Sequence, residues 1–224
     1  MKKIFYILIA IFMITSLGYA APNIYGSSGL IEMPTAESLQ YKEFNVGLDY
    51  SVKSEATPSS NNGVYYYKLN LGSFKGFELG IVGGTNPTEG VFVNLKYYLM
   101  SDNSRYPISI AIGMEKLTSH TDSSAYLVAS KKFQEGFHGH FGFKAHFLGA
   151  EIDSSIMLGL EYLLSDEFSI ETDILNLGNQ YRINSGVRYY FSDNIFFRAS
   201  ILDITNARGE GMLYNVGVSW TRFL

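Results

Sequence analysis

From about residue 42 to the end of the chain, apolar and polar residues alternate with a period of two. The first segment shows the pattern clearly: its apolar positions are Phe44, Val46, Leu48, Tyr50 and Val52, and the positions between them are Asn45, Gly47, Asp49 and Ser51. Successive side chains of a strand point to opposite faces of a sheet. The alternation therefore predicts a strand with one apolar and one polar face.

The same alternation recurs along the rest of the chain, and only 124–133 shows it weakly. The other segments are 64–71, 77–81, 91–99, 108–115, 137–147, 156–162, 168–174, 181–189, 195–201 and 214–220. None of them has a helical period. We therefore expect an all-β fold of about twelve strands, each about ten residues long, which is the length that a tilted strand needs to cross a membrane.

The connections between these segments alternate in length. Tight turns are expected at 101–103, 165–167 and 192–194, where Ser and Asp favour turns. Longer loops are expected at 54–63, 84–90, 117–123 and 205–211. Short turns on one side and longer loops on the other are typical of outer-membrane barrels, in which the short turns face the periplasm.

The breadth of the expected barrel decides which face meets the membrane. About twelve strands enclose a lumen too wide for bulky Phe, Tyr, Ile and Leu side chains to fill, so we expect these residues to face lipid and the polar set to line the lumen. The predicted fold is a transmembrane antiparallel up-and-down β-barrel over residues 42–224. Its aromatic-rich last strand, from Tyr214 to Phe223, resembles the terminal signal that the barrel assembly machinery recognises.

Residues 1–20 have the pattern of a signal peptide. A basic start, Met1-Lys2-Lys3, precedes the apolar run 4–17 and the small residues of Gly18-Tyr19-Ala20, so cleavage is expected after Ala20. The predicted location is the outer membrane of a Gram-negative-type cell. The sequence contains no Cys, so we expect no disulfide, thiolate metal site or lipid-anchored N-terminus. The net charge of −4 gives no basic excess for nucleic acid.

A distinctive motif precedes the first strand. It reads Gly29-Leu30-Ile31-Glu32-Met33-Pro34-Thr35-Ala36, followed by Phe44-Asn45-Val46-Gly47. This motif resembles the start of YjbH-like outer-membrane proteins, which are associated with exopolysaccharide export, and the resemblance implies polysaccharide-export components as partners. Pro34 is disfavoured inside a central strand. We therefore expect residues 21–41 to form either a strap at the periplasmic mouth or a segment inside the lumen.

Charged residues on the polar faces of the last strands are the candidate functional residues. They are Glu161, Glu171, Asp173, Arg182, Arg188 and Arg198. We expect Asp173 and Arg182 to lie nearly opposite each other on adjacent strands, and Arg188 and Arg198 to meet across the turn at 192–194. These charges could form a constriction that selects small polar or anionic solutes or saccharides. They could equally form a salt-bridge network that fills a closed lumen.

Two other chemistries receive less support. His138, His140 and His146 lie on one polar face, but no carboxylate follows with ligand spacing, so we expect lumen-lining residues and neither a metal nor a cofactor. The run 120–124 contains His, Asp and Ser, yet three adjacent residues rarely form a triad. The sequence therefore predicts a narrow channel or export-associated pore without enzyme activity. The alternatives are a closed structural or partner-binding barrel and a barrel-embedded hydrolase.

Overall fold

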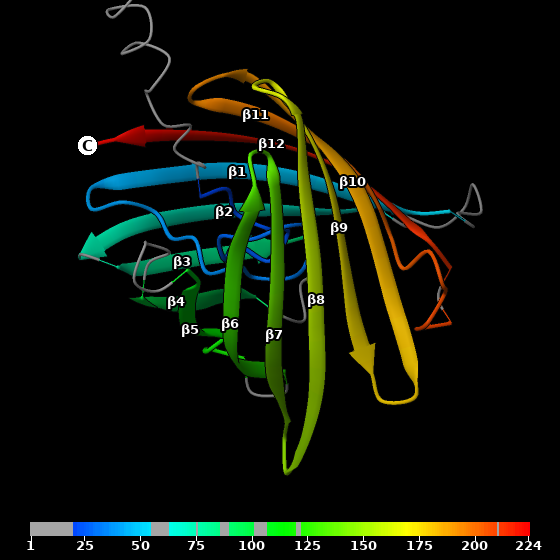
Figure 1. Cartoon of the computed structure of the whole chain (residues 1–224). Coiled ribbons are helices and arrows are strands. Elements are labelled where there is room, and N and C mark those ends of the chain that lie inside the picture. Colours follow the sequence, from blue (N-terminus) through cyan, green and yellow to red (C-terminus); the bar gives the residue numbers. More distant parts are fainter. Residues whose placement is uncertain are drawn as a thin grey trace, which may run out of the picture.

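The computed structural model describes residues 20–54, 63–74, 76–85, 90–100, 107–119, 122–209 and 211–224. Its twelve antiparallel strands form one closed barrel, in which each strand pairs with its sequence neighbours and β1 pairs with β12 (Figure 1). The predicted all-β barrel is confirmed. The strands are β1 (Glu43–Lys53), β2 (Gly63–Phe74), β3 (Phe77–Gly84), β4 (Val91–Met100), β5 (Ser109–Glu115), β6 (Ser123–Gln134), β7 (Phe137–Leu148), β8 (Glu151–Ser165), β9 (Phe168–Leu177), β10 (Gln180–Ser192), β11 (Ile195–Leu202) and β12 (Leu213–Phe223).

Some of the expected features fall on residues outside the ranges that the structure describes. The predicted signal peptide, except for Ala20, lies outside the described residues, and so do the turn at 101–103 and most of the loop 54–63. In the described part of the chain, no helix is long and apolar enough to cross a membrane.

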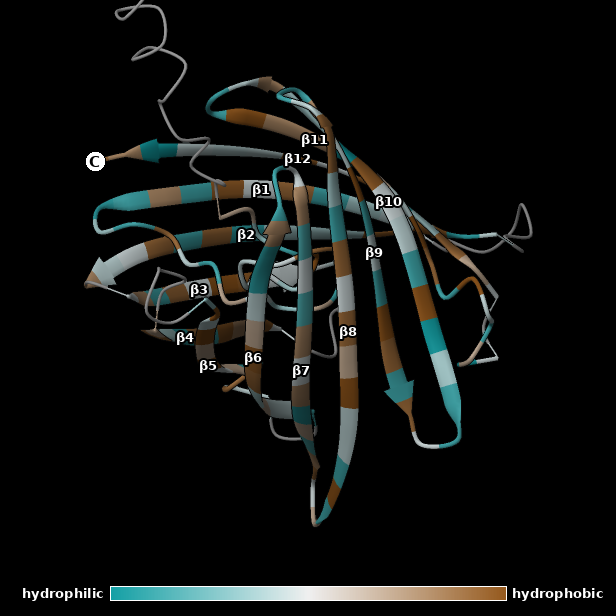
Figure 2. Ribbon diagram, viewed as in Figure 1, coloured by the Kyte–Doolittle hydropathy of each residue, from teal (hydrophilic) through white to brown (hydrophobic). Residues whose placement is uncertain are grey.

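The distribution of apolar residues is the reverse of that in a soluble protein. Large apolar side chains on alternate positions of the strands are exposed, as in Val46, Leu48 and Leu158. The intervening side chains are buried although they are polar or charged, as in Asn45 and Asp49. Figure 2 shows hydrophobic and hydrophilic residues alternating along the strands. The outer surface is therefore suited to hydrocarbon and the interior is polar.

The lumen is occupied by residues 20–41, which we call the plug. Every residue from Ala20 to Ala36 is buried except Tyr25, which is half-buried. The plug has no regular secondary structure and contains two isolated β-bridges, Pro22 with Ser28 and Gly29 with Pro34. In Figure 1 this segment lies inside the ring of strands. It ends at the turn before β1, so it returns to the mouth of the barrel at which both β1 begins and β12 ends.

Strand β6 shows why the alternation at 124–133 is weak. Its inward positions include Tyr126 and Val128, which are apolar and buried in a cluster with Met33 and Ala36 of the plug. This strand is therefore apolar on both faces, because its outward residues meet the exterior while these two side chains cover the plug. A pattern based on one strand could not reveal this second partner.

Candidate functional site

The carboxylate of Asp173 on β9 binds the backbone of the plug. Its Oδ2 atom accepts hydrogen bonds from three consecutive amides, those of Ile31 at 3.1 Å, Glu32 at 2.7 Å and Met33 at 3.0 Å. The other oxygen, Oδ1, accepts a hydrogen bond of 2.6 Å from Nδ2 of Asn184. Successive backbone amides that converge in this way form an anion-binding concavity. Asp173, predicted to line the lumen, thus binds the plug.

Glu32 of the plug binds the same part of the wall through its side chain. Its Oε2 pairs with Nη1 of Arg182 at 2.7 Å and accepts a hydrogen bond of 3.0 Å from Asn184. Its Oε1 accepts a hydrogen bond of 2.8 Å from the hydroxyl of Tyr25. Desolvation inside the lumen, together with the Glu32 carboxylate, raises the pKa of Tyr25 to about 12, so the phenol keeps the proton that it donates.

The expected pairing of Asp173 with Arg182 is wrong by two residues. The connection between β9 and β10 contains only two residues, 178 and 179, so Gln180 pairs with Leu177. In this register Asp173 lies opposite Asn184 and Arg182 lies opposite Leu175. The two charged residues still act on one target, because Asp173 binds the backbone of Glu32 and Arg182 binds its side chain.

The expected neighbourhood of Arg188 and Arg198 is present: they lie directly opposite each other on β10 and β11. Nη2 of Arg188 pairs with Oε1 of Glu171 at 2.5 Å, and Nε of Arg198 lies 4.0 Å from Oε2 of the same carboxylate. The guanidinium carbons lie 5.1 and 5.8 Å from the centroid of the Phe196 ring. One carboxylate and one aromatic ring therefore offset the repulsion between two buried cations.

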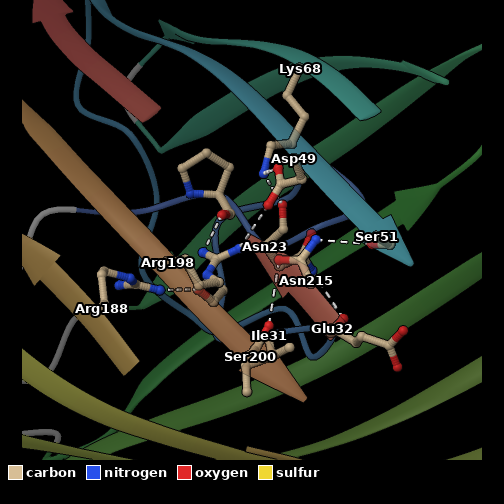
Figure 3. Close-up of polar contacts among 12 residues, drawn as sticks. Asn23, Ile31, Glu32, Asp49, Ser51, Lys68, Arg188, Arg198, Ser200 and Asn215 are labelled. Atoms are coloured by element: carbon tan, nitrogen blue, oxygen red, sulfur yellow. Dashed lines mark hydrogen bonds and ion pairs between the residues drawn. The ribbon is translucent and has the colours of Figure 1, made fainter. Parts of the chain in front are cut away.

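The same two arginines also bind the plug. Nη2 of Arg188 donates to the carbonyl of Gly29 at 3.1 Å, and Nη2 of Arg198 donates to the carbonyl of Pro22 at 2.6 Å. Arg198 also lies near Asp49, 3.9 Å away, and Asp49 pairs with Lys68 at 2.5 Å (Figure 3). Wall charges and plug carbonyls thus form one continuous polar network.

Strands β2 to β4 contribute further residues that the sequence analysis did not select as candidates. Glu78 accepts hydrogen bonds from the amides of Ser28 at 3.0 Å and Leu39 at 3.1 Å. Nζ of Lys68 donates to the carbonyl of Asn23 at 2.8 Å, and Nζ of Lys96 donates to the carbonyl of Ser28 at 2.9 Å. Their position on polar strand faces was visible in the sequence, but their targets are backbone groups, which have no sequence signature.

The described residues line a cavity towards each mouth of the barrel. The larger, which we call the vestibule, has a volume of about 410 Å³ and lies at the mouth opposite the chain ends, with Tyr25 and Glu32 of the plug in its lining. The smaller has a volume of about 60 Å³ and contains Glu161 with Ala20 and Ala21. Plug residues contribute to the lining of both cavities. The candidate charges consequently surround a filled lumen.

Glu161 and the histidines make local contacts. Glu161 lies 3.3 Å from Nδ1 of His138 and 3.8 Å from Nη1 of Arg188. Nδ1 of His140 lies 2.7 Å from the hydroxyl of Ser130, which accepts a hydrogen bond from the amide of Ala36 in the plug.

Within the described ranges, no group of three or more His, Cys, Asp or Glu residues could hold a metal ion. Of the run 120–124, residues 120 and 121 lie outside the described residues.

Comparison with solved structures identifies the class of fold. The KdgM porin superimposes with a TM-score of 0.58 at 13% identity, covering 79% of this chain and 98% of that chain. The NanC porin gives 0.53 at 15% identity with the same coverage, and the Acinetobacter baumannii outer membrane protein Omp33 gives 0.52 at 9% identity, covering 82% and 99%. These likenesses establish the fold, which is that of outer-membrane porins. No family model matches the sequence, and no curated protein matches it.

Proposed function

We propose that this protein is an outer-membrane channel of the porin type for small polar or anionic solutes or saccharides, and that the plug closes it at rest. The observation that carries the proposal is the contrast between the wall and the plug. The wall is a closed barrel with a charged interior, whereas the plug, joined to the wall at β1, is kept inside the lumen by hydrogen bonds, ion pairs and apolar packing. Displacement of the plug would leave a passage with charged walls inside a barrel whose outer surface is apolar.

The preference for anionic solutes rests on the arginines. Arg182, Arg188 and Arg198 lie on the neighbouring strands β10 and β11, so a displaced plug would expose a basic arc on one side of the passage. A ring or arc of Arg and Lys favours anions in a pore. One structure similar to this chain, with a TM-score of 0.57 at 12% identity, is the KdgM porin in complex with disordered oligogalacturonate, and this supports a saccharide as the solute.

We further propose that the signal peptide is removed after Ala20 and that the barrel assembly machinery inserts the mature chain. The chain ends would then face the periplasm and the vestibule would face the outside, as in barrels of this type. The resemblance of the Gly29–Ala36 motif to YjbH-like proteins supports polysaccharide-export components as partners.

Single-channel conductance in a planar lipid bilayer tests this proposal. The proteins are the mature chain and a variant lacking residues 22–40, both refolded and checked for a folded barrel by heat-modifiable gel mobility. We expect the mature chain to be closed for most of the record and the variant to conduct in discrete steps. Arg188→Glu in the deletion variant should lower its anion selectivity. A deletion variant that folds but stays silent would exclude the channel and favour a closed structural or partner-binding barrel.

A further inference from the structure

The vestibule has the size and composition of a small-molecule site. Its volume of about 410 Å³ lies within the range of ligand pockets, which is roughly 300–1,000 Å³. The plug supplies Tyr25 and Glu32 to its lining, while the wall supplies Tyr66, Phe92, Arg182 and Arg208. The rings of Tyr25 and Tyr66 meet edge to face, 6.3 Å apart, and provide apolar surface beside the charges.

Arg182 is the residue that points to a ligand. It is 1% exposed, and only its Nη1 atom has a hydrogen-bonded carboxylate, that of Glu32. Nε and Nη2 are buried and have no hydrogen-bond partner among the described residues. A guanidinium is a planar fork whose adjacent N–H groups bind a carboxylate through both of its oxygens. The hydroxyl of Tyr25 also interacts with this guanidinium, but Nε and Nη2 form an edge without a carboxylate, which suits a second carboxylate.

A second cation stands at the same cavity. Arg208 lies in the connection between β11 and β12, and its side chain is exposed in the vestibule lining. The connection is fixed by Asp203, whose oxygens accept hydrogen bonds from the amides of Ala207 at 2.7 Å and Arg208 at 3.0 Å. Glu32 is the carboxylate that pairs with Arg182, and Asp203, whose oxygens accept these backbone hydrogen bonds, adds a second negative charge near the same guanidinium. The lining also contains Glu115 and Asp122, which pair with Lys144 and Lys116, and Asp153, so the attraction for an anion is confined to the side of the vestibule formed by Arg182 and Arg208.

An anion bound to Arg182 would act on the plug, because Glu32 connects the two. The side chain of Glu32 pairs with Arg182, while its backbone amide is one of the three that bind Asp173. A second carboxylate on the guanidinium would share its charge and repel Glu32. The loss of this ion pair weakens the attachment of the plug at residues 31–33, and linkage requires that plug release in turn strengthens anion binding.

We infer that the vestibule binds a small carboxylate-bearing solute at Arg182 and that this binding releases the plug. The inference deepens the proposed function, on which it rests, by assigning an opening signal to the channel. The solute reaches Arg182 from the mouth opposite the chain ends, so an external carboxylate opens the barrel that it enters.

Cysteine labelling measures plug release directly, because the chain contains no Cys of its own. Ser27 of the plug is 2% exposed, so Ser27→Cys places a unique thiol of similar size inside the lumen. The probe is D-glucuronate, with D-glucose as the neutral match. We expect glucuronate to raise the maleimide labelling rate by about fivefold or more, in line with typical coupling between sites, and glucose to leave it unchanged.

Two variants locate the effect. Arg208→Gln in the Ser27→Cys background should shift the glucuronate response to higher concentration, whereas Arg222→Gln, which removes an exposed arginine on β12, should keep the response unchanged. An absent response to glucuronate would overturn the inference, and so would an equal response to inorganic phosphate, because the site would then not select a carboxylate.

The outcome can be separated from that of the proposed function. If the variant lacking residues 22–40 conducts but glucuronate does not change labelling, the inferred opening by a carboxylate is wrong and the proposed channel function is supported. If glucuronate accelerates labelling while that variant does not conduct, the binding site in the vestibule is supported and the proposed channel function is wrong.

Discussion

Oδ2 of Asp173 on β9 lies 2.7 Å from the backbone nitrogen of Glu32, a residue 141 positions earlier in the chain. The same oxygen also accepts hydrogen bonds from the two neighbouring amides. A carboxylate of the barrel wall thus takes the role that an external anion takes in other amide concavities. This contact makes the plug part of the folded barrel.

Asp173→Asn should loosen the plug without unfolding the barrel. The amide keeps the size of the side chain but loses the charge that the three N–H groups share, and hydrogen bonds to charged groups contribute about 1.5–3 kcal/mol each. In the Ser27→Cys background we expect a rise in maleimide labelling of about tenfold or more. Asp166→Asn, at an exposed turn, is the control. An unchanged labelling rate would show that Asp173 is not needed to hold the plug.

Glu171→Gln should destabilise the whole barrel. It leaves Arg188 and Arg198 opposite each other without the carboxylate that lies between them. Breaking a buried ion pair on one side costs about 3–5 kcal/mol. The urea midpoint of unfolding in detergent should fall, and the added substitution Arg188→Met should recover part of the loss. If the double variant is less stable than Glu171→Gln alone, charge repulsion is not the cause.

Gly29→Ala should displace the plug and leave the wall intact. A Cβ atom at this position would lie 2.2 Å from the carbonyl oxygen of Met33 and 2.8 Å from Cα of Pro34, so the tight turn between residues 29 and 34 cannot form around it. We expect conductance steps like those of the variant lacking residues 22–40, with normal heat-modifiable mobility. A variant as closed as the parent protein would mean that the plug holds without this turn.

Plug occupancy should fall at alkaline pH. The pKa of Tyr25 is about 12 in the plugged barrel and about 10 in its ordinary state, so the plugged form retains a proton that the released form loses. The stabilisation is complete below pH 10 and is lost as the pH rises from about 10 to about 12. Open probability in bilayers should rise through this window, and Tyr25→Phe should remove that component. Equal pH profiles for both proteins would contradict this prediction.

The outward face of β8 should tolerate charge poorly. Leu158 is 47% exposed near the middle of the strand, so Leu158→Arg places a cation where we expect hydrocarbon. The cost at the centre of a bilayer is about 2–4 kcal/mol and falls towards the interface. Ile152→Arg, near the start of β8 on the same outward face, should therefore cost less when unfolding is measured in lipid vesicles. Equal costs for the two variants would argue against a membrane around this face.

Much of the fold could be predicted because the alternation is local. Each strand specifies its own apolar face, as Val46 and Leu48 show on β1, and closure into a barrel follows from leaving no edge strand unpaired. Strand β6 was weakly patterned because Tyr126 and Val128 cover the plug, so its inward face is apolar. Here the pattern depended on a partner far away in the sequence.

The site was predictable only in part. The short turn between β10 and β11 brings Arg188 to Arg198, and this neighbourhood could be anticipated. The register between β9 and β10 could not be anticipated, because it depends on where the two-residue turn begins. In the structure, Asp173 lies opposite Asn184 and not opposite Arg182. Glu78 was overlooked because its targets are amides of the plug.

The sequence by itself determined the strands, their lipid-facing side and the set of charges on the inner side, because alternation with a period of two encodes the face of each residue. Only the tertiary structure decided what those charges bind. Asp173, Arg188 and Arg198 meet backbone amides and carbonyls of residues 20–41, and these main-chain groups do not depend on the side chains that the sequence specifies. Whether a charged lumen is open or filled therefore depends on the path of the chain through it.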